Sequence, residues 1–343
     1  MEKKEVILVT GSCGRIGTRV VERLKGRFVV VGFDLRTDCP VGQDELIAVD
    51  LGSQESVSKA FAHIQKKYGN RIRSVIHLAA YYSFEEKHSE LYDKVTVEGT
   101  RRLLEALKAF EVQQFMFTST MLLHKPTEVG SPITEDSPVE AKWDYPLSKV
   151  KTERVIHEMQ GEMKTLILRI AGVYDDQCHS IPISHQIERI YEKSFESRLF
   201  SGDVSHGAAF VHMEDLVNAM VDGVDKVEAL PKTLTLLIGE PKTMSYDQIQ
   251  RRVSRLLYGK EFTTFRVPKL LAKVGSWLQN LLPKKSFIRP WMIDFADDHY
   301  EMNVERAKKY LGWIPKRSLE KTLPIMIENL KKDPEKWYRI NGL

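Results

Sequence analysis

The chain has 343 residues, 42% of them hydrophobic and 29% charged, which is the composition of a globular protein with a sizeable core in one large domain or two smaller ones. Its formal net charge of +4 is spread along the sequence rather than gathered into a basic arm, so we expect no nucleic-acid partner. We also expect a cytoplasmic protein, because no apolar run is long enough to cross a bilayer and the first residues lack the pattern of a cleavable leader.

The first half of the sequence alternates short apolar runs with longer helical patterns. Strands are predicted at residues 6–10, 28–33, 46–50, 74–79 and 115–119, and helices at 15–24, 57–67, 91–110 and 145–159. Strands that alternate with helices require right-handed crossover connections and hence a parallel sheet. The predicted fold class is therefore α/β, with a doubly wound parallel sheet of the Rossmann type.

A glycine-rich segment, VTGSCGRIG, lies between the first predicted strand and the first predicted helix. Glycine is entropically costly in regular structure, so Gly11, Gly14 and Gly17 together indicate a backbone that comes unusually close to something. In dinucleotide-binding folds such a loop forms a tight turn, and the next helix directs its first amides and its positive dipole end at a pyrophosphate. The alternative is a turn without a ligand, but the position between a strand and a helix favours a nucleotide.

The second predicted strand ends in Asp34, whose carboxylate can accept hydrogen bonds from both ribose hydroxyls of NAD and would repel the 2′-phosphate of NADP. Arg15 and Arg36 lie close enough in sequence to soften this preference, yet NAD is favoured over NADP. The third strand is followed by Asp50 and Leu51, a pair suited to holding adenine, although an acidic strand end can equally form a helix cap or a turn.

The segment DYPLSK places Tyr145 and Lys149 four residues apart at the start of a helix, and therefore on one face of it. A free phenol titrates near pH ~10, and a neighbouring ammonium group together with a positively charged nicotinamide ring favours its ionised form. Tyr145 is thus predicted to be a general acid or base, with Lys149 lowering its pKa and anchoring the cofactor ribose. Two unrelated surface residues are the alternative, but the hydroxyls of Ser119 and Thr120 at the end of the fifth strand favour catalysis.

After Arg169 the alternation gives way to longer loops, an isolated strand at 233–239 and several helices. We predict that residues 1–170 form a NAD-binding Rossmann domain carrying the catalytic residues. Residues 171–343 are predicted to form mostly a smaller substrate-binding cap, with a segment at about 208–240 returning to the first domain. The cap is expected over the carboxyl edge of the sheet, where open α/β folds bind ligands.

The cysteines and histidines do not indicate a metal site. Cys13, Cys39 and Cys178 are odd in number and lack metal-ligand spacing, so reduced thiols are expected instead of a disulfide framework or a zinc site. His212 and His299 also lack such spacing and are expected to be structural. We therefore predict that the protein holds no metal.

These motifs together are similar to those of the extended short-chain dehydrogenase/reductase superfamily, and most of all to its NAD-dependent epimerase/dehydratase family, the group of UDP-galactose 4-epimerase. The matching segments cover almost the whole chain: TGSCGRIG, Asp34, Asp50-Leu51, HLAA at 77–80, the hydroxyl segment at 118–120, YPLSK, RIAGVY at 169–174, FVHMEDLVNAM at 210–220 and RAKKYLGWIPK at 306–316. It is the combination of motifs that makes the resemblance specific.

The resemblance implies NAD as the cofactor and a set of site residues. Thr120 takes the position of the catalytic Ser or Thr, Tyr145 that of the acid/base and Lys149 that of its partner. The implied cofactor-binding residues are Gly11, Cys13, Gly14, Arg15, Ile16, Gly17, Asp34, Asp50, Leu51, Leu78, Ala79, Ala80, Tyr145 and Lys149. Members move a hydride between a substrate carbinol carbon and C4 of the nicotinamide. A homodimer formed through the helices at 91–110 and 145–159 is implied as well.

The chain departs from the family pattern at positions that matter for the substrate. Thr96 and Gly172 stand where the family commonly has Asn. Ala208 and Ala209 stand where nucleotide-sugar enzymes often carry an Arg that grips the substrate diphosphate, and a second such Arg is not evident at 290–303. These departures argue against the usual way of holding a nucleotide diphosphate.

Two segments of the second half each allow two interpretations. The acidic and aromatic run at 295–301 either faces a hydroxyl-rich or cationic ligand or forms a solvated loop. The segment at 267–285 has apolar residues at helical spacing flanked by lysines. It suits a membrane surface or a partner, but packing against its own domain is favoured.

The leading hypothesis is a NAD-dependent sugar or nucleotide-sugar epimerase or dehydratase that acts by hydride transfer at a secondary alcohol carbon of a small-molecule substrate. A first alternative is a net NAD-dependent dehydrogenase or reductase of a non-nucleotide sugar, a sugar acid or another secondary alcohol, and the missing arginines favour it. A second alternative is a non-catalytic, NAD-binding regulatory protein, which the intact Thr120, Tyr145 and Lys149 set disfavours.

Overall fold

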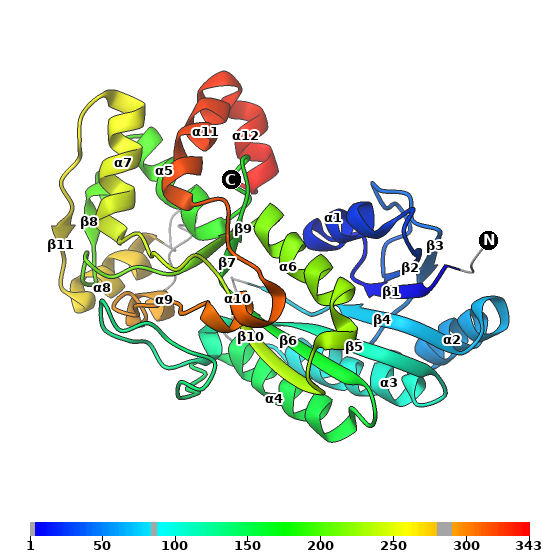
Figure 1. The fold of residues 1–343 in the computed structure, drawn as a ribbon. Coiled ribbons are helices and arrows are strands. Elements are labelled where there is room, and N and C mark those ends of the chain that lie inside the picture. Colours follow the sequence, from blue (N-terminus) through cyan, green and yellow to red (C-terminus); the bar gives the residue numbers. More distant parts are fainter. Residues whose placement is uncertain (1–3, 84–87, 280–289) are drawn as a thin grey trace.

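Figure 1 shows a twisted sheet with helices on both of its faces and a group of further helices at one end. The computed structural model describes residues 4–83, 88–279 and 290–343. The main sheet has seven strands in the order β3-β2-β1-β4-β5-β6-β10, and neighbouring strands are parallel throughout. The doubly wound α/β fold predicted from the alternation of strands and helices is confirmed.

The sheet and its covering helices use most of the first 240 residues. The strands are β1 (Val6–Thr10), β2 (Val29–Asp34), β3 (Glu45–Ala48), β4 (Arg71–His77), β5 (Glu111–Thr120), β6 (Lys164–Ile170) and β10 (Thr233–Ile238). The helices are α1 (Arg15–Leu24), α2 (Gln54–Tyr68), the π-helix η1 (Tyr92–Val97), α3 (Glu98–Leu107), α4 (Asp144–Met159), α6 (Met213–Asp225) and α10 (Glu305–Leu311). The short 3₁₀ turns are η2 (Met121–Leu123), η3 (Phe195–Arg198) and η4 (Val227–Ala229).

The helices form two layers, one on each face of the sheet. Helices α1 and α6 pack together on one face, whereas α2, α3 and α4 lie side by side on the other (Figure 1). The strand order reverses between β1 and β4, because the chain leaves β3 on one side of β1 and re-enters the sheet on the other. Open α/β sheets bind ligands at such a reversal, outside the carboxyl ends of the strands.

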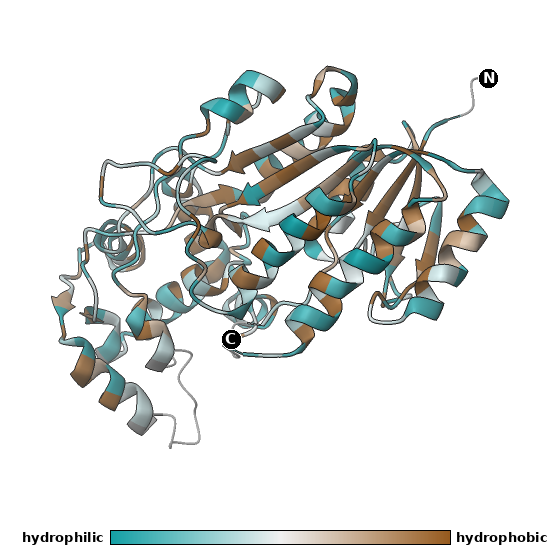
Figure 2. Ribbon diagram, turned by 90° about the horizontal axis from the view of Figure 1, so that it is seen from below, coloured by the Kyte–Doolittle hydropathy of each residue, from teal (hydrophilic) through white to brown (hydrophobic). Residues whose placement is uncertain are grey.

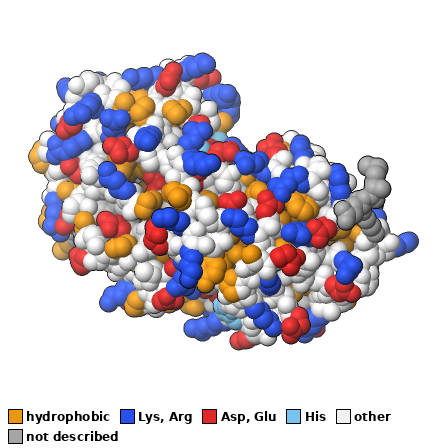
Figure 3. All heavy atoms as spheres, in the orientation of Figure 1, with side chains coloured by type: hydrophobic (Ala, Val, Ile, Leu, Met, Phe, Trp, Pro, Cys, Tyr) orange, Lys and Arg blue, Asp and Glu red, His pale blue; other side chains and the backbone are white. Residues whose placement is uncertain are grey.

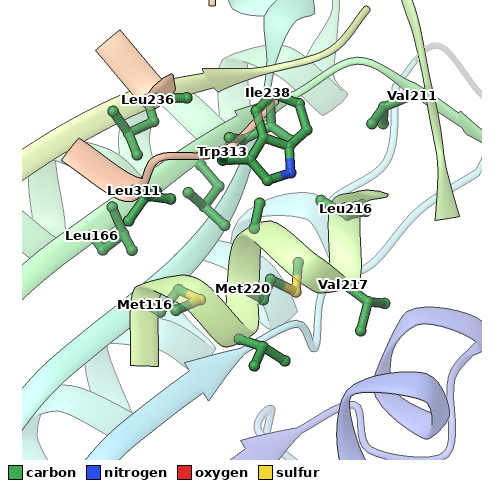
Figure 4. Packing of buried hydrophobic residues seen from close by; sticks show 14 of the residues in the cluster. Met116, Leu166, Val211, Leu216, Val217, Met220, Leu236, Ile238, Leu311 and Trp313 are labelled. Carbon is green, nitrogen blue, oxygen red and sulfur yellow. The ribbon is translucent and has the colours of Figure 1, made fainter. Parts of the chain in front are cut away.

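The largest core lies between the sheet and α6. Figure 4 shows Met116 of β5 and Leu166 of β6 facing Met220 of α6, with Trp313 closing the cluster from the segment after α10. The indole nitrogen of Trp313 donates a hydrogen bond to the Asp215 carbonyl oxygen at 2.8 Å, so its single polar atom is satisfied. Figure 2 shows the strands as mainly hydrophobic and the helices as hydrophilic on their outer sides, which is the pattern that buries both faces of a parallel sheet.

The strand predicted in isolation at 233–239 is β10, and it belongs to the main sheet. It pairs with β6 along its full length, from Thr233 beside Thr165 to Ile238 beside Ile170. The preceding helix α6 packs on the sheet beside α1, so the chain from α6 to β10 lies with the sheet and not with the cap.

The remaining elements form a cap at the carboxyl edge of the sheet. They are β7 (Gly172–Tyr174), α5 (Ile181–Tyr191), β8 (Leu199–Phe200), β9 (Phe210–His212), α7 (Tyr246–Tyr258), β11 (Phe265–Arg266), α8 (Lys269–Gln279), α9 (Pro290–Asp294), α11 (Leu319–Lys332) and α12 (Pro334–Asn341). Two short parallel pairs, β7 with β9 and β8 with β11, connect the loops of the cap. A separate apolar cluster that includes Ile187, Leu323 and Trp337 holds α5, α11 and α12 together.

The surface carries charges of both signs. On the face seen in Figure 3, Lys and Arg side chains are interspersed with Asp and Glu side chains over both the sheet layer and the cap. None of the helices that the structure describes has the length and apolar character needed to cross a membrane.

Gly17 allows helix α1 to lie against the glycine loop. A Cβ atom at position 17 would lie 2.1 Å from the carbonyl oxygen of Gly11 and 2.8 Å from the Cα of Ser12, which is a clash with backbone that cannot move aside easily. We expect Gly17→Ala to lower the free energy of unfolding by about 3 kcal/mol, the upper end of the usual cost of overpacking. Urea denaturation monitored by circular dichroism measures this.

Gly42→Ala is the matched control, because a Cβ there meets nothing within 4 Å and its backbone does not need a positive φ. We expect it to change the free energy of unfolding by less than about 0.5 kcal/mol. Equal stability of the two variants would contradict the close contact described for Gly17.

Candidate active site

The glycine loop between β1 and α1 lies directly against the end of β4. Gly11 has φ +69°, a left-handed conformation, and its amide donates to the Phe33 carbonyl oxygen at 2.7 Å. A Cβ at this position would lie 2.9 Å from the Ala79 amide nitrogen, so only glycine permits the contact between the loop and residues 78–80. The segment HLAA, singled out in the sequence, therefore forms one wall of the crevice above the strand reversal.

Gly14 faces open space, unlike Gly11 and Gly17. A Cβ built at Gly14 would have only the Gly11 carbonyl oxygen within 4 Å, at 3.2 Å. Gly14 is also the N-cap of α1 and provides no side-chain cap, so the first amides of this ten-residue helix are left for another acceptor. A crevice of this kind fits a dinucleotide pyrophosphate, in agreement with the prediction made from the glycine spacing.

Asp34 lies beside this loop at the end of β2. Its Oδ2 accepts from the Cys13 amide at 2.9 Å and its Oδ1 accepts from the Arg36 amide at 3.0 Å. The two arginines named in the sequence analysis are engaged elsewhere. The Arg36 guanidinium pairs with Asp38 at 3.2 Å, and Arg15 donates to the carbonyl oxygens of residues 179 and 340, each at 3.3 Å. This arrangement supports NAD rather than NADP.

Asp50 and Leu51 have different environments after β3. The Asp50 Oδ1 accepts from the Gly52 amide at 2.7 Å, so this carboxylate stabilises the turn that leads into α2. Leu51 is 5% exposed and packs in the core between the sheet and α2 and α3. Only the exposed Asp50 and the backbone of Leu51 are therefore available to a nucleotide.

A buried hydrogen-bonded chain beneath the site was not anticipated from the sequence. The Thr10 hydroxyl lies 2.7 Å from Nδ1 of His77, and Nε2 of His77 lies 2.8 Å from the Thr100 hydroxyl, which donates to the Thr96 carbonyl oxygen at 2.6 Å. Since Thr100 uses its proton on Thr96, His77 must donate from Nε2 and accept at Nδ1. Burial lowers the pKa of His77 to about 3, in keeping with this neutral form.

Thr96, one of the four departures from the family pattern, still supports the backbone near the site. Its hydroxyl accepts from the Tyr81 amide at 3.0 Å, and the side chain is fully buried. Thr96 belongs to η1, so the helix predicted at 91–110 begins with a π-helical turn before the regular α3. Such turns are frequent at functional sites, and nothing in the sequence pattern indicated this one.

The structure brings Thr120, Tyr145 and Lys149 together. Thr120 ends β5, Tyr145 lies in the first turn of α4, and Lys149 follows one turn later with its Nζ 5.9 Å from the centre of the Tyr145 ring. Ser119, the other hydroxyl considered, points to the opposite side of the strand, and its buried Oγ has no hydrogen-bond partner among the described residues. Thr120 is the one that contacts Tyr145.

Burial governs the titration of both groups of the pair. It raises the pKa of Tyr145 to about 12, and the neighbouring Thr120 hydroxyl opposes this only in part. It lowers the pKa of Lys149 to about 8, against the opposing effect of Glu153. The Lys149 ammonium also donates to the Thr118 carbonyl oxygen at 2.9 Å and lies 4.7 Å from the centre of the Phe117 ring. The site therefore holds a neutral phenol beside a lysine that loses its proton easily.

A cavity of about 500 Å³ opens in the cap between α5, α7, α8 and α9. This is the size of a small-molecule site. Its walls are mostly apolar, with side chains such as Phe200, Phe210, Met244, Ile249 and Ile293.

The cavity wall contacts the segment just before α4. Phe295 of the cavity wall stacks on Trp143, the N-cap of α4, with ring centres 5.0 Å apart. Asp298, also in the wall, forms an ion pair with Lys142 at 2.6 Å. Phe295 and Asp298 therefore connect the cavity wall to the two residues that precede α4.

The positions expected to grip a diphosphate carry no polar side chain. Ala208 lines the cavity, whereas Ala209 is fully buried in the main core and cannot face a substrate. A Cβ at Gly172 would meet Cδ1 of Phe210 at 2.9 Å, so an aromatic ring occupies the place of the family Asn. The departures seen in the sequence thus make this wall of the cavity apolar.

Ion pairs and hydrogen bonds to other parts of the chain hold the segment at 295–301 in place. Asp297 pairs with Lys269 at 2.7 Å and its backbone oxygen binds His206, while Asp298 pairs with Lys142. Within the described part of the chain, no group of three or more His, Cys, Asp or Glu residues could hold a metal ion.

The segment at 267–285 has features of both interpretations, packing on its own domain and exposure to a membrane surface or a partner. Residues 269–279 form α8, whereas 280–285 lie outside the described residues. Ala272, Gly275 and Ser276 line the cap cavity, as expected for packing on its own domain. Leu270 and Trp277 on the same helix are 74% and 58% exposed.

Comparisons with known proteins agree on one family. A model described as the NAD dependent epimerase/dehydratase family matches residues 7–239 of the chain. The chain is similar to 3 beta-hydroxysteroid dehydrogenase type 7 of Mus musculus, with 24% identity and 92% of this chain and 93% of the relative covered. It is similar to UDP-glucose 4-epimerase of Bacillus subtilis (strain 168), with 29% identity and coverage of 92% and 93%. In fold it is similar to UDP-glucuronic acid 4-epimerase of Bacillus cereus, solved with UDP-glucuronic acid and NAD, with a TM-score of 0.72, 20% identity and coverage of 95% and 99%.

The buried Lys149 is expected to destabilise the fold at neutral pH. Its pKa in the folded protein, about 8, lies below the value of 10.5 that applies to the unfolded chain, so the unfolded chain binds more protons between these pH values. The free energy of unfolding therefore rises with pH across that window, by about 3 kcal/mol in total. We expect Lys149→Met to raise the free energy of unfolding of the NAD-free protein by about 1 to 3 kcal/mol at pH 7, and the gain to shrink towards pH 10.5.

Denaturant titrations of wild type and variant at several pH values measure this difference. Lys151→Met is the control, because Lys151 lies on the same helix but is exposed and pairs with Asp93 at the surface. A Lys149→Met variant that is less stable than wild type at pH 7 would contradict the predicted effect.

Proposed function

The chain belongs to the NAD-dependent epimerase/dehydratase family, and from this premise we propose that it moves a hydride between NAD and a secondary alcohol carbon of a sugar derivative, as an epimerase or dehydratase. It is an enzyme of the extended short-chain dehydrogenase/reductase type with NAD as its cofactor. The observation that carries the proposal is the gathering of Thr120, Tyr145 and Lys149 at the carboxyl edge of the sheet, beside the glycine loop.

We propose that the predicted cofactor-binding residues each bind a different part of the NAD molecule. The loop from Gly11 to Gly17, with the first amides of α1, would take the pyrophosphate, and Asp34 the adenosine ribose. Asp50 and the backbone of Leu51 would hold the adenine, and Leu78, Ala79 and Ala80 would line the path to the nicotinamide. NAD, when bound, supplies the acceptor for the hydride.

Tyr145 is proposed to move the proton. When the substrate alcohol is oxidised, its hydroxyl proton passes to the Tyr145 oxygen, and Thr120 holds the substrate oxygen in line. The phenol alone is a poor base because burial raises its pKa to about 12. Lys149 and the positive charge of an oxidised nicotinamide are the groups that can lower it.

Tyr145→Phe is expected to lower turnover by at least about 100-fold, because it removes the only proton-transferring atom and leaves the aromatic packing in place. The assay uses UDP-glucose and a 3β-hydroxysteroid, the two substrate types in the names of the relatives, and follows whichever of them the wild-type enzyme converts. NAD affinity, measured by fluorescence quenching, is expected to change less than about twofold, since Tyr145 contributes little binding energy to the cofactor.

Tyr68→Phe provides the control, because Tyr68 lies at the end of α2, at the opposite edge of the sheet from the site. It should leave turnover unchanged. A fully active Tyr145→Phe enzyme would rule out the proposed chemistry and favour a NAD-binding protein without catalysis.

A second candidate function is a net NAD-dependent dehydrogenase of a non-nucleotide alcohol. The apolar cavity favours it, since Ala208 and Phe210 stand where a diphosphate would need polar partners. The similarity to a hydroxysteroid dehydrogenase over nearly the whole chain points the same way.

Whether the purified protein retains NAD distinguishes the two candidate functions. Arg15 of α1 donates hydrogen bonds to the carbonyl oxygens of His179 and Ile340, and Arg19 of the same helix pairs with Asp175 at 3.4 Å. These contacts attach the cap to α1, beside the proposed NAD site. The attachment of the cap to α1 supports a NAD molecule that stays bound and is reoxidised in each turnover. We expect about one NAD per chain to be released when purified, dialysed protein is denatured and its nucleotide identified. An empty protein that forms stoichiometric NADH with an alcohol would establish the dehydrogenase instead.

The homodimer through the α3 and α4 face, the cytoplasmic location and the division at residue 170 stay predictions of the sequence. The exposed positions of Leu91 and Leu147, each 40% exposed and both near that face, are compatible with a dimer contact.

A further inference from the structure

The cap cavity contains one strong cation that none of the described residues neutralises. Arg189, on α5, is the only Lys or Arg among the described residues that line the cavity. Its guanidinium forms no ion pair and no hydrogen bond with any described residue, and its Nε is buried without a partner. A guanidinium group offers five donors, and a buried donor without an acceptor is costly.

Two carboxylates, those of Glu196 and Asp298, and two imidazole groups also line the cavity. Asp298 pairs with Lys142, and no ion pair links Arg189 to either Asp298 or Glu196 within the described structure. His185 contacts Glu188 at 2.8 Å, and His206 binds the Asp297 carbonyl oxygen at 2.7 Å. Arg189 therefore leaves the cavity with a positive site in an apolar surrounding.

The surroundings of Arg189 favour an anion with an apolar body. Phe200 and Tyr246, both in the cavity wall, stack with ring centres 3.8 Å apart and present a flat apolar surface. In so apolar a site, a charged hydrogen bond to a guanidinium is strong and its geometry specific, because few water molecules compete for it.

We propose that Arg189 anchors a carboxylate or phosphate group of the substrate in the cap cavity and so selects substrates that join one anionic group to an apolar body. The inference rests on the proposed function for the identity of the substrate pocket. It assigns the anion to α5 and not to Ala208 or Ala209, the positions where the family resemblance led us to look for an arginine. Arg189 acts in selectivity and is not a catalytic residue.

The test uses two fluorescent probes with one aromatic body. 8-Anilinonaphthalene-1-sulfonate carries a sulfonate group, and N-phenyl-1-naphthylamine lacks it. Both are titrated into NAD-loaded wild type and into Arg189→Met, which removes the charge and keeps much of the side-chain volume. We expect the variant to bind the sulfonate probe at least about 10-fold more weakly and to bind the neutral probe within about twofold of wild type.

Arg339→Met is the matched control, because Arg339 is an exposed cation of the cap, on α12, away from the cavity. It should change neither affinity. Gly275→Phe, which builds a ring into the cavity from α8, should weaken both probes and so locate them. Neutral-probe binding that is retained by Arg189→Met shows that this variant still folds.

Competition then identifies the kind of anion. UMP serves as the phosphate competitor and deoxycholate as the carboxylate competitor. Each is titrated against the sulfonate probe bound to wild type and to Arg189→Met. Displacement that is strong in wild type and at least about 10-fold weaker in the variant supports the proposal and names the group. Equal displacement in both proteins, or an equal loss of both probes in Arg189→Met, overturns it. Since probe binding needs no turnover, failure of this test is distinct from failure of the Tyr145→Phe test.

Discussion

The contact between the glycine loop and the end of β4 is the constraint on which the rest of the structure depends. Gly11 lies within contact distance of the Ala79 backbone, and Gly17 lies against the Gly11 carbonyl. These two contacts bring α1 down onto the sheet at the strand reversal. The open side of Gly14 and the free amides of α1 then face the crevice. One arrangement of backbone thus fixes both the helix packing and the place where a pyrophosphate can bind.

Polar groups near the glycine loop are buried at an energetic cost. His77, between Thr10 and Thr100, is fully buried and neutral, and its hydrogen bonds join β1, β4 and α3. Lys149 is buried as well, and its lowered pKa shows that the fold disfavours its charged form. Residues kept in such positions despite the cost of burial are typical of sites where chemistry requires them.

The cap is fixed to the sheet by buried carboxylates and contains a cavity that is more apolar than the edge of the sheet beside the glycine loop. The Asp215 carboxylate accepts the amides of Lys316 and Arg317, and Glu240 accepts the Tyr174 hydroxyl at 2.8 Å and the Leu319 amide at 2.9 Å. These bonds hold the segment leading into α11 against α6 and the end of β10. The cavity beyond them has mostly apolar walls, and its Arg189 has no partner among the described residues.

The sequence by itself determined the features that depend on neighbours along the chain. The alternation of strands and helices specified the parallel sheet, the spacing of Gly11, Gly14 and Gly17 specified the turn and helix start, and the four-residue spacing placed Tyr145 and Lys149 on one helix face. The tertiary structure alone decided what depends on distant segments meeting. It placed β10 beside β6, linked His77 to Thr100, set Trp143 on Phe295 and left Arg189 without a partner among the described residues. No local pattern encodes these contacts, because each joins residues at least 23 positions apart or requires knowing which charges find no partner.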